Sequence, residues 1–550
     1  MMNKILMVHP SDNVMVALTD LEANETISYE GSFYTPIENI NAKHKFALSD
    51  FNEGDEIQMY GVLVGKATKE IKRGQAITTS NVKHAANEVK VGERKTAWGK
   101  PDVSAFQHRT FQGYHRSDGQ IGTQNVWLVV PLVFCENRNV LAAKEILEEK
   151  LGYSKGRDYE LDIDRLISKS QSGATASDLL TEDILVPTKE ATKERVFKNV
   201  DGIKFLLHDG GCGGIRQDSD TLCQLLAGYL NNPNVAGATF LSLGCQNAQV
   251  EILQDAIFKM NPELDKPLFF VEQQKSNSEG EFIADIVTKT MAGLVEANKI
   301  ERKEAPISAL RLGLECGGSD GFSGISANPV MGYVSDMLVT LGATPILAEF
   351  PELNGVEQSL TDRCVTQTDA ERFVELMAIY KKRAEAVGSG FDANPSPGNI
   401  KDGLITDAMK SAGAAKKGGS SPIVGVLDYT EQIKNKGLNL LCTPGNDVES
   451  TTALAGSGAT LITFSTGLGT PTGNPITPVI KVASNSILAE RMKDIIDFDT
   501  GAVVRGENSI AEKAAEMLDY LLAVASGKAE TNAMRLRQDD FIPWKRGISL

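Results

Sequence analysis

Apolar and polar positions alternate in two different ways along the chain, and the change falls near residue 105. Before it, short alternating segments such as 13–18 and 56–65 are separated by turns that contain glycine, asparagine and aspartate, a pattern typical of a small β-rich unit. After it, apolar strands alternate with helical segments, for example a strand at 126–131 and a helix at 142–149. Strand–helix alternation at this spacing predicts parallel or mixed α/β sheets.

These patterns predict an α/β protein with a small β-rich N-terminal module and two larger α/β domains. The module spans residues 1–86, and the polar, aperiodic segment 87–104 reads as a linker. A charged segment that ends in proline separates a central domain, 105–302, from a C-terminal domain, 303–550. In the C-terminal domain we expect helices at 329–341, 368–387 and 403–412, a strand at 344–349, and a flexible turn at 416–422.

Composition narrows the class of protein. A chain of 550 residues with 41% hydrophobic and 23% charged residues is typical of a globular protein with more than one core. It has no run of about 18 apolar residues and no signal-peptide pattern, so we expect a cytoplasmic protein without a membrane partner. The net charge of −16 argues against nucleic acid as a partner. Seven cysteines without CxxC pairs indicate reduced thiols, and they disfavour a zinc ribbon.

Two glycine-rich loops hold most of the reactive side chains. They are segments 208–214 (HDGGCGG) and 315–321 (ECGGSDG), and each follows an apolar strand. Open α/β sheets bind ligands at the carboxyl ends of their strands, and imidazole, carboxylate and thiolate together suit Fe(II) or Zn(II) better than Ca(II). The candidate metal ligands are His9, His208, Asp209, Cys212, Glu315 and Cys316. The alternatives are a general base at His208 and a plain strand end with an inert, buried cysteine.

Other polar segments supply candidates for proton transfer and substrate binding. Arg116 can hold a carboxylate through two hydrogen bonds. The candidate catalytic residues are His44, His115 and His208, and the candidate substrate-binding residues are Arg116, Asn125, Asn137, Arg138, Gln246, Ser465 and Thr466. Because the first module carries His9 and His44, we hypothesise that it closes over the site as a lid.

The cysteines offer a different kind of site. Cys212, Cys245 and Cys316 each follow a predicted strand, so they are candidate ligands of an iron–sulfur cluster. The absence of the tight CxxC spacing disfavours this alternative. No GxxxxGK[ST] or GxSxG motif occurs, so neither a P-loop nor a nucleophile elbow is supported.

Taken together, a series of long motifs resembles the altronate/galactarate dehydratase family. The motifs follow one another along nearly the whole chain, at 9–14, 44–48, 111–125, 133–139, 208–214, 244–246, 315–320 and 464–467. The resemblance implies that the first module is a SAF domain. It also implies dehydration of a small-molecule sugar acid, D-altronate to 2-dehydro-3-deoxy-D-gluconate and water, with galactarate as the alternative substrate.

The same resemblance implies a divalent metal, iron (Fe²⁺) in the first place and manganese (Mn²⁺) as the alternative. In the implied reaction the metal and an arginine polarise the carboxylate, a base removes the C2 proton, and an acid protonates the leaving C3 hydroxyl. Two other functions remain open at this point: a thiol- or iron–sulfur-dependent oxidoreductase, and a carbohydrate-binding protein without catalysis. A homo-oligomer is compatible with the sequence, which does not fix the oligomeric state.

Overall fold

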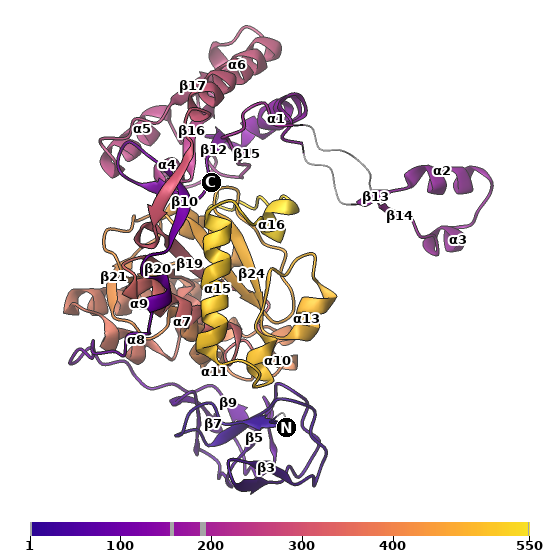
Figure 1. Ribbon diagram of the computed structural model, residues 1–550, viewed down its shortest axis with the longest axis vertical. Coiled ribbons are helices and arrows are strands. Elements are labelled where there is room, and N and C mark those ends of the chain that lie inside the picture. The colour runs from indigo at the N-terminus through magenta and orange to yellow at the C-terminus, as the bar shows by residue number, and fades with distance from the viewer. Residues whose placement is uncertain (1–2, 155–158, 188–193, 548, 550) are drawn as a thin grey trace.

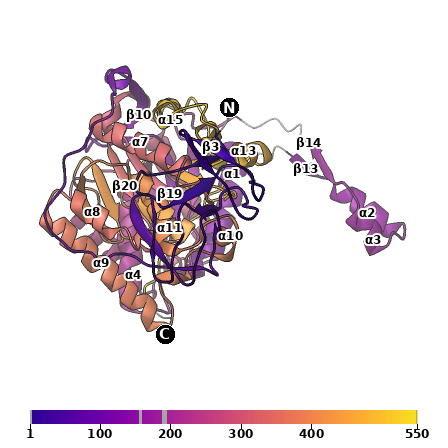
Figure 2. The ribbon, with the colours of Figure 1, turned by 90° about the horizontal axis from the view of Figure 1, so that it is seen from below.

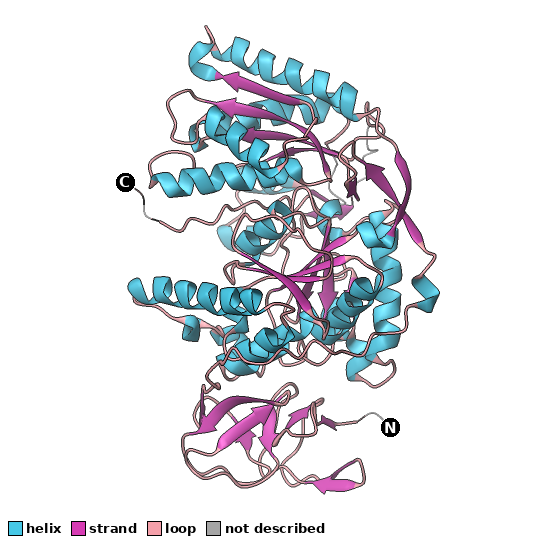
Figure 3. Ribbon diagram, turned by 90° about the vertical axis from the view of Figure 1, so that its left-hand side faces the viewer, coloured by secondary structure: helices cyan, strands magenta, loops and turns pink. Residues whose placement is uncertain are grey.

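The computed structural model describes residues 3–154, 159–187, 194–547 and 549. Three parts follow one another along the longest axis, with the N-terminal module at one end, the C-terminal domain in the middle and the central domain at the other end (Figure 1). Helices cover the sheets of both larger domains, whereas the N-terminal module consists of strands and loops (Figure 3). The predicted α/β class with a β-rich first module is therefore confirmed.

The N-terminal module contains nine short strands in three antiparallel sheets. The strands are β1 (Ile5–Leu6), β2 (Val14–Ala17), β3 (Ile27–Tyr29), β4 (Ser32–Tyr34), β5 (Lys45–Ala47), β6 (Glu56–Met59), β7 (Val62–Ala67), β8 (Ala76–Ile77) and β9 (Val82–Lys83). The alternating segment 56–65 is a hairpin rather than one strand. Tyr60 and Gly61 form its turn with φ of 59° and 77°, a conformation common in two-residue hairpin turns.

The central domain is built on a four-stranded parallel sheet of order β15-β12-β16-β17. Its strands are β12 (Val126–Pro131), β15 (Gly202–Phe205), β16 (Val235–Ser242) and β17 (Leu268–Glu272), and its helices are α1 (Asn137–Leu151), α4 (Arg216–Asn231), α5 (Val250–Met260) and α6 (Glu279–Ala297). The Trp127 side chain lies buried between Gly237 and Gly293, where an added Cβ would come within 2.4 Å and 2.0 Å of the indole ring. Close packing of helix and strand at this point therefore depends on glycine.

Two smaller sheets accompany the central one. β10 (Thr110–His115) pairs with both β11 (Ile121–Gly122) and β18 (Arg302–Pro306), so the two ends of the central domain lie side by side. An arm consisting of β13 (Tyr159–Leu161), α2 (Ile163–Gln171), α3 (Ala176–Leu180) and β14 (Leu185–Pro187) projects away from the rest of the chain in two perpendicular views (Figures 1 and 2).

The C-terminal domain contains a seven-stranded parallel sheet of order β21-β22-β20-β19-β23-β24-β25. Its strands are β19 (Arg311–Cys316), β20 (Thr344–Leu347), β21 (Ile423–Leu427), β22 (Leu438–Leu441), β23 (Leu461–Thr466), β24 (Val479–Ala483) and β25 (Phe498–Asp499). β20, β22 and β21 lie on one side of β19, and the chain then crosses to place β23, β24 and β25 on the other side. Ligands of open α/β sheets bind where the strand order reverses in this way.

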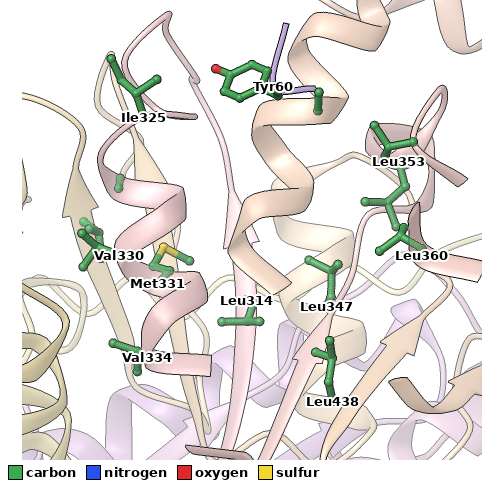
Figure 4. Close-up of a cluster of buried hydrophobic side chains, with 14 of the residues drawn as sticks. Tyr60, Leu314, Ile325, Val330, Met331, Val334, Leu347, Leu353, Leu360 and Leu438 are labelled. Carbon is green, nitrogen blue, oxygen red and sulfur yellow. The ribbon is translucent and has the colours of Figure 1, made fainter. Parts of the chain in front are cut away.

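Helices of the C-terminal domain pack on both faces of this sheet. They are α7 (Ala327–Thr340), α8 (Glu357–Arg363), α9 (Gln367–Ala386), α10 (Pro397–Lys401), α11 (Asp407–Ala414), α12 (Asp447–Gly456), α13 (Ser486–Arg491), α14 (Gly501–Val504), α15 (Ile510–Ala525) and α16 (Asn532–Arg535). One large apolar cluster joins α7, the sheet and the N-terminal module, with Val330, Leu314 and Tyr60 among its members (Figure 4). Within the described residues, no helix combines the length and the apolar character needed to cross a membrane.

Two segments differ from their predicted form. Segment 416–422, expected to be a flexible turn, begins in the 3-10 helix η7 (Ala415–Gly418), and its Lys417 is fully buried. The expected linker 87–104 runs against the C-terminal domain, where the Lys90 amide donates to Gln358 and Lys95 pairs with Asp362. Both differences arise from partners distant in sequence, which local polarity does not reveal.

Candidate active site

The reversal point of the C-terminal sheet collects a group of buried ionisable side chains. Glu315 and Cys316 end β19, Glu349 and Glu352 follow β20, Lys410 lies on α11, and Lys417 lies on η7. We call these six residues the acid–lysine cluster. All six are buried, with relative exposures of 9% or less, so their charges must be compensated inside the protein.

The two lysines supply that compensation. Lys417 Nζ lies 2.5 Å from Glu349 Oε2 and 2.8 Å from Cys316 Sγ. Lys410 Nζ lies 2.7 Å from Glu352 Oε1, and the Cys316 thiol donates to Glu352 Oε2 at 3.0 Å. The cluster is thus one connected network in which each ammonium faces a carboxylate.

The protonation states differ sharply within the network. Burial, followed by repulsion from Glu349, raises the pKa of Glu315 well above its usual value. Burial would also raise the pKa of Glu352, but Lys410 and Lys417 outweigh it and lower this pKa to about 2. Glu352 is therefore ionised, whereas Glu315 holds its proton to a higher pH than an ordinary glutamate does. One oxygen each of Glu315 and Glu349 has no hydrogen-bond partner, and a proton shared between the two carboxyls would satisfy both.

Two hydroxyl groups form hydrogen bonds with the cluster, one from the segment after β22 and one from α12. Ser450 Oγ, on α12, donates to Glu315 Oε2 at 2.6 Å and lies 2.9 Å from Thr443 Oγ1. The Glu349 amide donates to Thr443 Oγ1 at 2.8 Å. Glu349 itself has φ of 65°, a sparsely populated conformation for a residue with a side chain and one that clusters at functional sites.

An open cleft of about 840 Å³ adjoins the cluster. Glu352, Lys410 and Asp447 line it, together with Arg383 and Lys545. Burial, followed by repulsion from Glu349 and Glu352, raises the pKa of Asp447 to about 7. The cleft therefore combines a carboxyl group that titrates near neutral pH with cationic groups suited to an anionic ligand.

Glycine makes room for this carboxyl. A Cβ on Gly317, which also lines the cleft, would lie 2.2 Å from Asp447 Oδ2. Asp447 is the first residue of α12, where the unpaired amides of a helix N-terminus favour a negative charge. The glycine-rich segment after β19 thus provides space at the cleft rather than ligands.

The cluster does not fit a divalent metal as its side chains are arranged. Cys316, Glu349 and Glu352 form the one group of three metal-ligating side chains found in the described parts of the chain, with ligand atoms within 4.8 Å of one another. The Lys417 ammonium is hydrogen-bonded to two of these three side chains, and Lys410 pairs with the third. Two cations already balance the donors that a metal would need.

The structure places the three predicted catalytic histidines apart from this cleft. His208 Nε2 lies 2.7 Å from the Pro131 carbonyl, and its Nδ1 accepts from the Gly210 amide, so both ring nitrogens are engaged. His44 Nε2 lies 3.0 Å from the Lys401 carbonyl, which ties the N-terminal module to the C-terminal domain. His115 Nε2 lies 3.0 Å from the Glu304 carbonyl, between paired strands. Each of the three histidine rings thus contacts the backbone of a segment distant in sequence.

The predicted substrate-binding residues are likewise distributed over several places. The buried Arg116 donates to the carbonyls of Pro233 and Gln124 and to Asn125 Oδ1. Asn125 in turn donates to two backbone carbonyls. Arg138 forms an exposed ion pair with Glu279.

The remaining four predicted binding residues lie at the start of α1, after β16 and at the end of β23. Asn137 donates to the His208 carbonyl, and Gln246 donates to Ser242 and accepts from the Gly244 amide. Ser465 Oγ donates to Asn328 Oδ1, and Thr466 Oγ1 accepts from the Gly469 amide, at the end of β23. None of the seven predicted binding residues lines the 840 Å³ cleft.

The predicted metal ligands fall into three groups. His9 lies on the N-terminal module and contacts Ser11. His208, Asp209 and Cys212 lie in the central domain, and Glu315 and Cys316 belong to the acid–lysine cluster. Cys316 is therefore separated from Cys212 and Cys245, with which the sequence grouped it, because the two loops end strands of different sheets.

Sequence reasoning missed most of the cluster. Glu349, Glu352, Lys410 and Lys417 were not among its candidates, and Asp447, which lines the adjoining cleft, was not a candidate catalytic residue. Glu349 and Glu352 follow the strand 344–347 just as Glu315 ends its own strand, so the strand-end rule could have identified them. Lys410 and Lys417 lack any such signal, because a lysine in a helix or turn normally faces solvent.

These features define an α/β enzyme whose cleft is suited to proton transfer on an anionic small molecule. Three family profiles match the chain: "Altronate/galactarate dehydratase SAF domain" at residues 3–85, "D-galactarate dehydratase/Altronate hydrolase, second domain" at 113–298, and "D-galactarate/Altronate dehydratase, C-terminal" at 307–549.

Full-length relatives agree with these profiles. An altronate dehydratase of Escherichia coli (strain K12) is 32% identical over 99% of both chains, and one of Bacillus subtilis (strain 168) is 31% identical over 96% of both. A galactarate dehydratase (L-threo-forming) of Escherichia coli (strain K12) is 31% identical over 95% of this chain and 93% of its own. The chain belongs to the altronate/galactarate dehydratase family and is a hydro-lyase. This membership disfavours the oxidoreductase alternative.

Proposed function

We propose that the enzyme dehydrates D-altronate to 2-dehydro-3-deoxy-D-gluconate, and that galactarate is the alternative substrate. The observation that carries the proposal is the cleft itself, which is lined by Asp447, Glu352 and the cationic Lys410. Two relatives of nearly equal length, each an altronate dehydratase, support altronate over galactarate. One relative of similar identity, a galactarate dehydratase, keeps galactarate as the second candidate.

The sugar-acid carboxylate is the group that the cationic side chains of the cleft would recognise. Arg383 and Lys545 line the cleft on the side of α9 and the C-terminal segment, and Lys410 lines it beside Glu352. Arginine offers a planar pair of donors that matches a carboxylate, and lysine offers a compact charge. The polyhydroxy chain would then extend toward the amides of Asn394 and Asn399, which line the same cleft.

Asp447 is the proposed general base for the C2 proton. Its pKa of about 7 keeps much of it ionised at neutral pH, yet makes it a stronger base than an ordinary aspartate. Removal of the C2 proton places negative charge on the substrate carboxylate as an enediolate. The Lys410 ammonium, held at 2.7 Å from Glu352, lines the same cleft and is positioned to stabilise this charge. The C3 hydroxyl then leaves as water together with the proton that Asp447 has taken from C2, which regenerates the base. The resulting enol tautomerises to the 2-keto acid.

A metal requirement stays a prediction, with iron(II) first and manganese(II) second. The acid–lysine cluster gives the metal no place, because Lys417 and Lys410 already pair with its carboxylates. Treatment with a chelator is expected to lower turnover, and Fe²⁺ or Mn²⁺ is expected to restore it; full activity in chelator would contradict the requirement.

The test measures formation of the 2-keto-3-deoxy acid from D-altronate and from galactarate by purified protein. Turnover of altronate and its loss in D447N support the proposal. The matched control is E449Q, because Glu449 lies on the same helix with a pKa also raised to about 7 but does not line the cleft. Full activity of D447N removes Asp447 from the reaction, and no product from either acid refutes the proposed function.

A further inference from the structure

Three loops at one edge of the central sheet each carry a cysteine. Cys135 follows β12, Cys212 follows β15, and Cys245 follows β16. These strands are direct neighbours in the sheet, in the order β15-β12-β16, and they run parallel. Their carboxyl ends therefore bring the three loops together at the same edge.

Backbone hydrogen bonds fasten the three loops to one another. The Phe134 amide donates to the Gly210 carbonyl at 3.1 Å, and the amides of Asn247 and Ala248 donate to the Gly211 carbonyl at 2.9 Å and 3.0 Å. Gly211 has φ of 96°, and a Cβ there would lie 2.0 Å from the Leu132 carbonyl oxygen. The loop that holds Cys212 is thus clamped between those that hold Cys135 and Cys245.

The three thiols differ from the other four cysteines in accessibility. Cys135 and Cys245 are exposed and Cys212 is half-buried, whereas Cys223, Cys316, Cys364 and Cys442 are buried. Buried cysteines usually serve as small apolar side chains, but exposed thiols do not contribute to a core. The Gln274 side chain donates to Cys245 Sγ at 3.3 Å, so this sulfur accepts a hydrogen bond from a side-chain amide.

The surroundings favour a negatively charged group. Three helices of 11 to 16 residues, α1, α4 and α5, begin directly after these loops, and the N-terminus of a helix stabilises an anion. Polar atoms next to Cys135 also lack partners: Glu136 Oε1 and Asn139 Oδ1 are buried without a hydrogen bond, on residues that are 0% and 3% exposed. Buried polar atoms without a partner call for an explanation, and a bound group beside them would supply one.

We propose that Cys135, Cys212 and Cys245 hold an iron–sulfur cluster of the four-iron type, with the fourth iron free of cysteine. A single ion is the poorer fit, because the three sulfurs are not among the ligand atoms that lie within 4.8 Å of one another in the described part of the chain. A cubane cluster, in contrast, binds its cysteines through different iron atoms and keeps their sulfurs farther apart. Close spacing in sequence is not required when three parallel strands deliver the ligands.

The position of the site also suggests what the fourth iron would bind. Cys212 lines a small pocket together with Trp544 and Lys545, and both of these residues also line the 840 Å³ cleft. An iron without a cysteine ligand takes oxygen ligands, so the ligand class is a hydroxyl or carboxylate of the substrate. This role of the iron rests on the proposed dehydration, whereas the cluster itself does not.

In the experiment, the full chain is purified without oxygen and incubated with ferrous iron, sulfide and a thiol reductant. Unbound iron and sulfide are then removed. Iron and acid-labile sulfide are then measured, together with the visible absorption spectrum and the electron paramagnetic resonance spectrum after reduction. We expect iron and sulfide in roughly equal amounts and a cluster signal. Iron without sulfide, zinc alone, or no bound metal would overturn the proposal.

Variants locate the cluster. C135A, C212A and C245A are each expected to lose most of the bound sulfide, whereas C223A, a change at the buried cysteine of α4, is expected to retain it. Circular dichroism shows whether each variant is folded, and a serine variant replaces any alanine variant that is not. Sulfide retained by all three would refute the assignment. Because sulfide is counted without turnover, a cluster in a protein inactive on sugar acids upholds this inference and refutes only the proposed function.

Discussion

Replacing Lys417 by methionine tests whether the acid–lysine cluster is a compensated charge network. Lys417 and Glu349 are each 1% exposed and lie 2.5 Å apart. Methionine keeps the volume of the apolar stem but leaves the carboxylates without their central cation. Removing one partner of a buried ion pair costs about 3–5 kcal/mol, because the other charge stays buried and uncompensated.

This cost can be expressed as a shift in melting temperature. The C-terminal domain, 307–549 by its family profile, is in the size range in which 1 kcal/mol lowers Tm by about 2–4 °C. K417M is therefore expected to lower the calorimetric transition of this domain by about 6–20 °C at neutral pH. The domain must be followed by its own transition, since a chain with several domains does not unfold in one step.

Two further variants make the expectation specific. K545M, at a lysine 37% exposed and 3.6 Å from Asp209, is expected to change stability by no more than about 0.5 kcal/mol. The double variant K417M/E349Q should recover part of the lost stability, because it removes a charge that K417M leaves unpaired. A Tm for K417M within about 2 °C of the wild type would refute the compensated network.

Three other predictions concern the reaction, the module and the core. If Asp447 acts as the base, kcat/KM rises with pH up to about 7, since the base must be ionised. D447N should lower kcat by a factor of about 10²–10⁴. A kcat/KM that falls with rising pH over this range would contradict the assignment. Burial lowers the pKa of Lys45, whose ammonium donates to the Gly403 carbonyl, to about 7. Since this pKa lies below that of an unfolded lysine, Lys45 should increase the free energy of unfolding as pH rises from about 7 to about 10. Scanning calorimetry should show this increase in stability in the wild type but not in K45M. Equal pH dependence of the two proteins would contradict it. G293A places a Cβ 2.0 Å from the Trp127 ring and should cost at least about 1–3 kcal/mol by overpacking, seen as a lower Tm of the central domain; an unchanged Tm would show that the ring can move aside.

The strand–helix pattern predicted the fold well because burial leaves a periodic signal. The strand at 126–131 has the bounds of β12, and the helix expected at 368–387 is α9 within one residue at each end. These segments are apolar on the faces that the sheets and helices bury, so local sequence and tertiary packing agree. The segment 56–65 departs from its prediction because a two-residue turn, Tyr60–Gly61, interrupts an otherwise alternating run.

The site was less accessible to prediction from sequence. Strand-end acids such as Glu315 were found because a motif marks them, but Lys417 looks like part of a flexible lysine–glycine turn. It is buried only because carboxylates from β19 and β20 converge on it, and the sequence does not record that convergence. His208 drew attention because histidine is scarce, yet its ring holds backbone groups together. Cys135 could be grouped with Cys212 and Cys245 only once the sheet order showed that β15 and β16 lie on either side of β12.

The central claim is that the cleft beside the acid–lysine cluster dehydrates a sugar acid with Asp447 as the base. The most direct measurement is the exchange of the C2 hydrogen of D-altronate with deuterated water, read by NMR alongside formation of 2-dehydro-3-deoxy-D-gluconate, in wild type, D447N and E449Q. The account predicts product from wild type and E449Q, and neither exchange nor product from D447N. Product formation by D447N at the wild-type rate would contradict it.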